Sequence, residues 1–490
     1  MTSLTKANEF ILNNKKTVNP MFRNQYHLMG PIGWINDPNG FVYFRGEYHL
    51  FYQFYPYDSV WGPMHWGHAK SKDLIHWEDL PVALAPSEDY DIDGCFSGTA
   101  LVKDDKLYLF YTGHVENETL KREVQCMAVS DDGIHFEKSM NNPLVDETHI
   151  ENIASPEDFR DPKVFAREDV YFMLVASQTA DSRGQILMFR SKNLKDWFFY
   201  SVLLEGNSTQ GIMWECPDLF QLNGKDVLIM SPIQMPKEDH KYANRSSTVA
   251  FIGEINWETG KMHVDNYHEI DSGLDFYAPQ TVINGQGERY LTAWMQMWDR
   301  NMPTNDLKHG WAGSMTLPRK LSIKNNKLIQ QPVKFSKEQL ISKRKLVDVL
   351  VNDSRAVVEP IKKANRINLE VDLSKGELFT IHYGKNEENY FEISYNVLDS
   401  LLTISRELIG QPITGAEKPN LNKRSAYVPL NKGKLGLDLY GDTSSIELFT
   451  HDGQTLSTTF FEENFTEIIE ITSTGDALIE VLEIYDINVN

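Results

Sequence analysis

The stretch SKDLIHW (71–77) recurs in altered form as SDDGIHF (130–136) and as SKNLKDW (191–197). Each copy begins with serine and ends in an aromatic residue, and successive copies lie about 60 residues apart. A regular internal period of this length, in a chain rich in β-forming residues, indicates a radially repeated or stacked fold. In a propeller, equivalent strands line one central channel. We therefore expect residues at equivalent places in the repeat to converge in space.

Five hairpins are predicted between residues 30 and 330. In FVYFRGEYHLFYQF (41–54), two runs of β-forming residues flank a turn. The scheme recurs in TALVKDDKLYLFYTG (99–113), KVFAREDVYFMLVAS (163–177), DLFQLNGKDVLIMSP (218–232) and QTVINGQGERYLTAWM (280–295). Each hairpin is followed by one or two further strands, which predicts a β-propeller of five four-stranded blades. Before the first blade, Leu4, Ala7, Phe10 and Ile11 mark one face of a short helix capped by Thr2 or Ser3.

The remainder of the chain has a different character. At 490 residues the chain is too long for a single core, so two domains are expected. After residue 350, short alternating strands separated by charged or glycine-containing turns are typical of a β-sandwich. We therefore predict an all-β protein with a propeller at 1–331, a linker at 332–350 and a C-terminal β-sandwich at 351–490. The lysine-rich stretch 332–344 is expected to form a short linking helix.

The composition bears on the class of protein and its partners. The chain is 41% hydrophobic and 24% charged, values that are ordinary for a soluble globular protein. Its net charge of −21 argues against nucleic acid and anionic membranes as partners. Cys95, Cys126 and Cys216 are too few for a disulfide framework. No apolar run resembles a signal peptide or a membrane span, so a cytoplasmic location is expected. The sequence does not indicate the oligomeric state.

Three acidic residues stand just before three of the hairpins. Asp37 lies in WINDPNG (34–40), Asp161 in FRDP (159–162) and Glu215 in WECPD (214–218). Taken alone, Asp-Pro-Asn-Gly is also good turn chemistry, because proline fixes φ and glycine accepts positive φ. The three acids, however, stand at what look like matching places at the mouths of three blades. A cluster of carboxylates in one pocket is what glycoside hydrolysis requires.

The chain resembles glycoside hydrolase family 32, the invertase and fructosidase family, over nearly all of its length. The resemblance is carried by HLMGPIGWINDPNG (27–40), FYQFYP (51–56), WGPMHWGHAKSKDLIHWEDLPVALAP (61–86), FSGTA (96–100), FRDPKV (159–164), WECPDLF (214–220), DFYAPQT (275–281), WAGSMTLPR (311–319) and GDTSSIELFTHDG (441–453). Within the family it is most similar to bacterial sucrose-6-phosphate hydrolases and intracellular β-fructofuranosidases. The chain departs from the family pattern at Tyr55, Gly30 and Thr99, none of which is one of the three acids.

The resemblance implies a role for each acid. Asp37 is the expected nucleophile, Glu215 the general acid/base and Asp161 the transition-state stabiliser of a retaining glycosidase. Arg160 is expected to help hold its neighbour Asp161 as a carboxylate. The alternative for Asp161 is a purely structural salt bridge with Arg160. Cys216, next to the expected acid, either tunes Glu215 or simply fills a small buried space.

Further residues are expected to bind the substrate. Asn36 and Gln53 carry amides that can bond to sugar hydroxyls, and Ser97 can donate to a hydroxyl or to the nucleophile. The complete expected set is Trp34, Asn36, Pro38, Asn39, Gln53, Trp61, Phe96, Ser97, Arg160 and Trp298. For each aromatic residue, packing in the core is the alternative. His65 and His68 could form a metal pair, but no convincing third ligand accompanies them, so neither a metal nor a cofactor is expected.

The resemblance implies hydrolysis of the terminal β-D-fructofuranosyl bond of a small sugar, sucrose 6-phosphate or sucrose. An intracellular hydrolase of short fructo-oligosaccharides is an alternative substrate assignment, and a transfructosylase would differ only in how well water competes with an acceptor sugar. An alternative from another class is a catalytically inactive sugar-binding propeller. The presence of all three acids argues against it.

Overall fold

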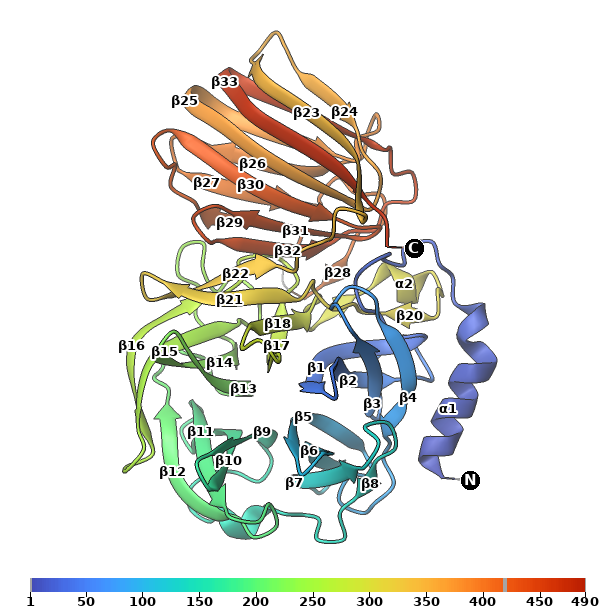
Figure 1. The fold of residues 1–490 in the computed structure, drawn as a ribbon, viewed down its shortest axis with the longest axis vertical. Helices are drawn as coiled ribbons and strands as arrows, with labels where there is room; N and C mark the ends of the chain where they lie inside the picture. Colours follow the sequence, from blue (N-terminus) through green and yellow to red (C-terminus); the bar gives the residue numbers. More distant parts are fainter. Residues whose placement is uncertain (1, 417–420, 490) are drawn as a thin grey trace.

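The computed structural model describes residues 2–416 and 421–489, and it confirms the predicted fold class. Five antiparallel sheets are arranged as the blades of a propeller around a central axis, and a large curled sheet covers one side of it (Figure 1). The N-terminal helix α1 (Ser3–Asn14) lies outside the propeller beside β4, as Figure 1 shows. Its predicted cap is confirmed, because the Thr2 side chain accepts a hydrogen bond from the amide of Thr5. None of the helices in the described ranges is long and apolar enough to span a bilayer.

The five blades follow the chain in order. Blade 1 contains β1 (Gly33–Phe44), β2 (Glu47–Tyr55), β3 (His65–Ser71) and β4 (Glu78–Leu84), and blade 2 contains β5 (Gly94–Lys103), β6 (Lys106–Glu116), β7 (Lys121–Ser130) and β8 (Glu137–Lys138). Blade 3 contains β9 (Phe159–Arg167), β10 (Val170–Gln178), β11 (Gly184–Ser191) and β12 (Phe198–Glu205), and blade 4 contains β13 (Met213–Leu222), β14 (Lys225–Ile233), β15 (Val249–Asn256) and β16 (Lys261–Glu269). Blade 5 contains β17 (Tyr277–Ile283), β18 (Arg289–Trp294), β21 (Arg319–Lys324) and β22 (Lys327–Pro332). All five predicted hairpins are confirmed.

Short elements complete the propeller. They are the 3-10 helices η1 (Lys15–Thr17) and η2 (Glu147–His149), the helix α2 (Pro303–Asp306), and the two-residue strands β19 (Arg300–Asn301) and β20 (Trp311–Ala312). Strand β20 returns to blade 1 and pairs in parallel with β1. The chain segment that follows β18 in blade 5 therefore also hydrogen-bonds to the innermost strand of blade 1, which ties the last blade to the first.

The repeated phrase is a turn between the third and fourth strands of blades 1 to 3. Ser71, Ser130 and Ser191 end β3, β7 and β11. Each serine Oγ accepts a hydrogen bond from the backbone amide three residues later, at 2.8 to 3.0 Å. The residue that donates has a positive φ in all three copies. The phrase therefore encodes one local conformation, which explains its regular spacing.

The C-terminal sheet contains β23 (Leu340–Val351), β24 (Val357–Pro360), β25 (Asn365–Tyr383), β26 (Phe391–Asn396), β27 (Leu401–Ser405), β29 (Lys423–Tyr427), β30 (Lys434–Gly441), β31 (Ser445–Thr450), β32 (Thr455–Thr459) and β33 (Ile468–Ile487). The two-residue strand β28 (Thr414–Gly415) pairs instead with β19 of the propeller part. Strands β25 and β33 are long, with 19 and 20 residues, and pair along most of their length, whereas only short strands were expected after residue 350.

The predicted linking helix at 332–344 is wrong. Residues from Leu340 onward form β23, which pairs antiparallel with β33. The lysines that suggested a polar helix instead lie on the outer side of this strand, where Lys343 and Lys345 both reach Glu483. Charged side chains on such an exposed strand also discourage pairing with another chain. The second half of the expected linker is therefore part of the C-terminal sheet, while the domain limits at 331 and 351 stay a prediction.

A buried ionic network joins the propeller to the C-terminal sheet. The imidazole of His27 lies 2.8 Å from Asp442 and 2.8 Å from Glu447, and these side chains are fully buried. Arg319 of β21 donates to Glu447 as well and bonds to Asp271 at 2.9 Å. Burial by itself lowers the pKa of His27, but its hydrogen bonds to the two carboxylates raise the pKa from 6.5 to about 9. The imidazolium is therefore part of the junction at neutral pH.

This pKa predicts how stability depends on pH. The folded protein holds the His27 proton up to about pH 9, whereas the unfolded chain releases it near 6.5. The stabilisation, up to about 3 kcal/mol, is therefore complete below pH 6.5 and is lost as the pH rises through 9. Urea unfolding followed between pH 6 and 9 should show this loss in the wild type, and His27→Gln should lack it. Parallel pH profiles for the two proteins would contradict the assignment.

Candidate active site

The innermost strands β1, β5, β9, β13 and β17 share one irregularity. Each has a shift in its pairing register with the next strand near the start of its hairpin. Beside these shifts lie five pairs of successive residues: Asn36 and Asp37, Phe96 and Ser97, Arg160 and Asp161, Glu215 and Cys216, and Tyr277 and Ala278. A β-bulge re-aims the side chains beside it. The five pairs therefore bring side chains from every blade to one end of the central channel.

The expectation that the three acids occupy matching places is wrong by one residue for Glu215. Asp161 and Cys216 occupy the same place, since both have positive φ, of 68° and 50°, and both precede a proline. Asp37 also precedes a proline, whereas Glu215 stands one residue earlier, in the place of Arg160. Both members of each pair reach the channel end, so an acid at either place can join the cluster.

Asp37 accepts hydrogen bonds on both carboxylate oxygens. Ser97 Oγ donates to Oδ2 at 2.8 Å, and Asn36 Nδ2 donates to Oδ1 at 3.1 Å. The thiol of Cys216 lies 3.5 Å from Oδ2. Burial and the negative charge of Glu215 raise the pKa of Asp37, while these three donors lower it, and the net shift is upward.

Asp161 is held by the backbone and by the same thiol. The Cys216 amide donates to Asp161 Oδ2 at 2.9 Å, and the Cys216 thiol lies 3.5 Å from that oxygen. Cys216 is thus the residue that contacts both aspartates. Burial raises the pKa of its thiol well above the ordinary range, so the group stays protonated and can donate. Of the two readings of Cys216, the contacts favour a residue that acts on the acids, although it acts on the aspartates and not on Glu215.

Glu215 is the most accessible of the three acids. Its side chain is 17% exposed, whereas Asp37 and Asp161 are buried residues. Arg160 donates to Oε1 from Nε at 3.1 Å and from Nη2 at 2.9 Å, and the Tyr277 hydroxyl donates to Oε2. Glu215 is therefore held from two neighbouring blades while part of it faces the open end of the channel.

Arg160 serves a different acid from the one expected. Its guanidinium bonds to Glu215, and Nη1 donates to Glu123 at 3.1 Å and to Asp158 at 2.8 Å. Among the ion pairs of the described residues, none joins Arg160 to Asp161. The structural salt bridge between these two neighbours, considered as an alternative, is therefore not formed. Glu123 is itself buried and also accepts the amide of Phe159 at 2.8 Å, which fixes the start of β9.

The acids cannot all be ionised together. Arg160 does lower the pKa of Asp161, but burial and the charges of Glu215 and Asp37 outweigh it and raise that pKa to about 8. Arg160 therefore acts on Asp161 in the expected direction, but one guanidinium does not compensate for three crowded, buried carboxyl groups. At neutral pH the cluster keeps a proton.

The aromatic residues expected to bind substrate surround this cluster. Trp34 Nε1 donates to Asn36 at 2.8 Å, and Trp298 stacks on Trp34 with ring centroids 6.2 Å apart. On the other side, Trp61 meets the edge of Phe96 at 6.2 Å. Trp61 is 46% exposed, which is consistent with a rim residue and not with core packing.

Other expected residues lie deeper. Gln53 is buried on β2 opposite the Asn36–Asp37 pair, and its amide donates to the Cys95 carbonyl at 3.0 Å. Asn39 lies one step further down the channel, where its side chain accepts the amide of Gly98 at 3.3 Å. Pro38 is buried next to it. Among the hydrogen bonds of the described residues, none joins Pro38 or Asn39 to one of the three acids, so the structure gives them a place in the channel wall.

The two histidines considered as a metal pair have protein partners. His65 Nδ1 bonds to the Pro63 carbonyl at 2.9 Å, and His68 Nε2 lies 3.0 Å from His49 Nδ1. His68 also stacks on Phe51 at 4.0 Å. These contacts fix both imidazoles within blade 1.

Tyr277 and Glu123 were missed by the sequence reasoning. A signal for Tyr277 was present, because Tyr-Ala-Pro stands before the fifth hairpin as Arg-Asp-Pro stands before the third. No comparable signal marks Glu123, which lies on β7, a third strand, and reaches Arg160 only because two blades pack together.

Comparison with known proteins places these features in a family. Residues 27–332 match the glycosyl hydrolases family 32 N-terminal domain, and residues 329–486 match the family 32 C-terminal domain. The chain is 39% identical over 450 residues to the sucrose-6-phosphate hydrolase of Zymomonas mobilis, covering 88% of this chain and 84% of that protein. A Bombyx mori GH32 β-fructofuranosidase variant in complex with sucrose is 33% identical with a TM-score of 0.84, covering 99% of this chain and 98% of that one. The sucrose-6-phosphate hydrolase of Lactobacillus gasseri is 29% identical with a TM-score of 0.87, covering 98% and 96%.

The contact between Tyr277 and Glu215 predicts a kinetic effect. Tyr277→Phe removes a hydrogen bond to a carboxyl group, and such bonds contribute roughly 1.5–3 kcal/mol. We expect turnover of sucrose, the ligand in the Bombyx mori structure, to fall roughly ten- to a hundredfold. Tyr111→Phe is the matched control, because the buried Tyr111 hydroxyl donates to Asp91 at 2.9 Å. Similar turnover losses in both variants would show that only general stability is affected.

Proposed function

The chain belongs to glycosyl hydrolase family 32 and is a glycoside hydrolase of the β-fructofuranosidase kind; we propose that it cleaves the terminal β-D-fructofuranosyl bond of sucrose 6-phosphate or sucrose by double displacement. The observation that supports this most is the meeting of Asp37, Asp161 and Glu215 in one network at one end of the channel. One carboxyl group must be ionised and another protonated in such a reaction.

In the first step, a carboxylate oxygen of Asp37 attacks the anomeric carbon of the fructosyl unit. Ser97, Asn36 and Cys216 donate to this carboxyl group and so favour its ionised form. Glu215 gives its proton to the glycosidic oxygen as the bond to the leaving sugar breaks. The product is a fructosyl ester on Asp37, with the leaving sugar released as an alcohol.

In the second step, Glu215 takes a proton from water, the water oxygen attacks the same carbon, and the bond to Asp37 breaks. Fructose leaves and Asp37 is ionised again. The accessibility of Glu215 supports its assignment as the group that meets the leaving sugar and then water. Asp161 is buried beside Asp37 and Glu215. It is assigned as the residue that stabilises the positive charge of the fructosyl unit in the transition state.

We further propose that the leaving group is glucose 6-phosphate or glucose. Relatives named sucrose-6-phosphate hydrolase support a phosphorylated substrate. Hydrolysis of short fructo-oligosaccharides and transfer of fructose to another sugar stay alternatives. An inactive sugar-binding protein is disfavoured because all three acids are present and joined. Cys95, Cys126 and Cys216 are free and buried, which supports a location in a reducing compartment, and we propose the cytoplasm.

Lys121 is a candidate phosphate contact, and it is linked to Glu215 through Asp158 and Arg160. Lys121 Nζ is 3.4 Å from Asp158, and Asp158 accepts a hydrogen bond from Arg160, which holds Glu215. The Lys121 side chain is one-third exposed at the start of β7. It can therefore swing toward a phosphate on the leaving sugar without disturbing the acids.

The proposal predicts an ordering of substrates. Specificity constants kcat/KM measured for sucrose 6-phosphate, sucrose and 1-kestose should be highest for sucrose 6-phosphate, and this advantage should shrink at high salt. Lys121→Gln should lower kcat/KM for the phosphorylated sugar severalfold and leave that for sucrose unchanged. Lys106→Gln is the matched control, because Lys106 pairs with Asp131 at the turn that starts β6, far along the same blade.

Two results would count against the proposal. Equal kcat/KM values for sucrose 6-phosphate and sucrose, at both low and high salt, would show that there is no phosphate subsite. The protein would then be a plain β-fructofuranosidase. Activity of Asp37→Ala above about a tenth of the wild-type value would remove the proposed nucleophile, since loss of the attacking group costs several orders of magnitude.

A further inference from the structure

A cavity lies at the end of the propeller axis opposite the acids. It has a volume of about 440 Å³ and is lined by all five innermost strands, each at a point beyond the residues of the site. Its walls include Phe41 of β1, Leu101 of β5, Phe165 of β9, Phe220 of β13 and Val282 of β17. We call this space the lower cavity. Its size and its largely apolar walls are those of a small-molecule site.

Most of the charged side chains that line the lower cavity are cations, although the protein as a whole is strongly acidic. The chain carries 69 acidic residues against 48 lysines and arginines. The charged residues that line the lower cavity are Lys163, Arg167 and Arg289 against a single carboxylate, Asp226. Two of these cations are paired with carboxylates outside the lining, so the charge that favours an anionic ligand is that of Arg289.

Arg289 is the cation that lacks a counter-ion. Lys163 is paired with Asp218 at 2.8 Å, and Arg167 with Glu168 at 3.0 Å. Arg289 donates from Nη1 to Thr281 Oγ at 2.8 Å, and its guanidinium lies 4.5 Å from the centre of the Phe220 ring. No carboxylate of the described residues forms an ion pair with it.

An uncompensated guanidinium in such a place is costly. Burial lowers the pKa of Arg289 and the charge of Asp218 raises it, and the net shift is downward, although the residue is only half-buried. A buried charge is normally balanced by a partner of opposite charge. A guanidinium also offers two parallel donors to a carboxylate or sulfonate. The missing partner is therefore well matched by an anionic group that enters the cavity.

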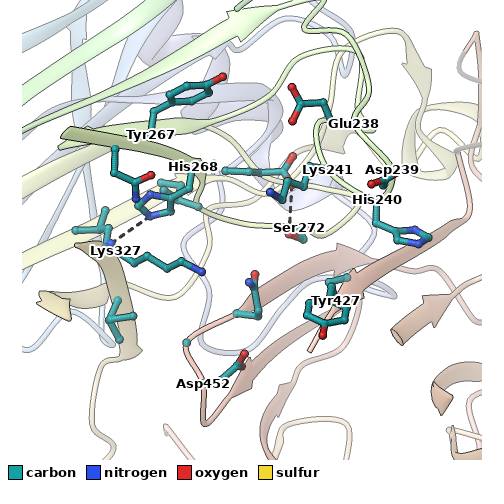
Figure 2. Close-up of a pocket in the computed structure, with 18 of the residues that line it drawn as sticks. Glu238, Asp239, His240, Lys241, Tyr267, His268, Ser272, Lys327, Tyr427 and Asp452 are labelled. Carbon is teal, nitrogen blue, oxygen red and sulfur yellow. Dashed lines mark hydrogen bonds between the residues drawn. The ribbon is translucent and has the colours of Figure 1, made fainter. Parts of the chain in front are cut away.

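A larger cavity elsewhere shows that this charge pattern is not general. It measures about 950 Å³ and lies between the propeller and the C-terminal sheet, where His268 and Lys327 of the propeller lie across from Tyr427 and Asp452 (Figure 2). Its lining carries Glu238, Asp239, Glu269, Asp399 and Asp452 against Lys241 and Lys327. This excess of carboxylates disfavours an anion there, so charge sets the lower cavity apart.

We propose that the lower cavity binds a small organic anion with a flat apolar body. Its carboxylate or sulfonate would pair with Arg289, and its body would lie against the aromatic walls formed by Phe41, Phe165 and Phe220. Because the acids lie at the other end of the axis, this ligand and the fructoside substrate would bind independently. The inference does not rest on the proposed function.

The probe 1-anilinonaphthalene-8-sulfonate has the required chemistry, with a flat aromatic body and one sulfonate. Its fluorescence should report one site per chain in the folded protein, and sodium benzoate should displace it while saturating sucrose should not. Arg289→Gln should weaken binding about tenfold or more, because a charge-assisted hydrogen bond is lost. Arg183→Gln is the matched control, since Arg183 is an arginine outside the cavity that pairs with Asp181 and Glu205. It should bind the probe as the wild type does.

Two further measurements keep the test decisive. N-phenyl-1-naphthylamine has the same rings without the sulfonate and should bind about tenfold more weakly to the wild type but equally to wild type and Arg289→Gln. If Arg289→Gln does not fold, Ile283→Trp, at an exposed position on the rim, should block the cavity and abolish binding. Equal affinity of the sulfonate probe for wild type and Arg289→Gln, binding that survives Ile283→Trp, or displacement by sucrose would overturn the proposal.

Discussion

The site depends on one backbone constraint, the register shift that interrupts each innermost strand at the same level of the propeller. A regular strand alternates its side chains between two faces, so it would present only one residue of each successive pair to a given place. The shift lets two neighbouring residues reach the channel end. As a result, Arg160 bonds to Glu215 while its neighbour Asp161 bonds to Cys216, and Cys216 also contacts Asp37.

Crowding three carboxyl groups at one place has a chemical consequence. The charge of Glu215 raises the pKa of both aspartates, Asp37 adds to the effect at Asp161, burial raises both pKa values further, and donors from four blades oppose the effect only in part. The cluster therefore retains a proton at neutral pH, which is what a double displacement needs at its start. The arrangement is rigid because Arg160 is held by Glu123 and Asp158 as well as by Glu215.

Much of this could be predicted from the sequence, because local signals were strong. Hairpin turns, the serine turn of the repeat and the acid-proline motifs are set by neighbouring residues. The offset of Glu215 was missed although the sequence carries it, since Asp37 and Asp161 directly precede a proline whereas Cys216 stands between Glu215 and its proline. Glu123 was missed because its role comes from packing between blades. The strand that begins at Leu340 was read as polar helix because its partner, β33, lies more than a hundred residues later.

We propose that Asp37 attacks the fructosyl carbon, so that two inversions give retention. The direct measurement is the anomeric form of the first fructose released, followed by NMR within seconds of mixing, before mutarotation mixes the forms. Attack by Asp37 predicts that β-D-fructofuranose appears first and that the α form accumulates later. An α-anomer present first would contradict it, because water would then attack directly and Asp37 would be a general base.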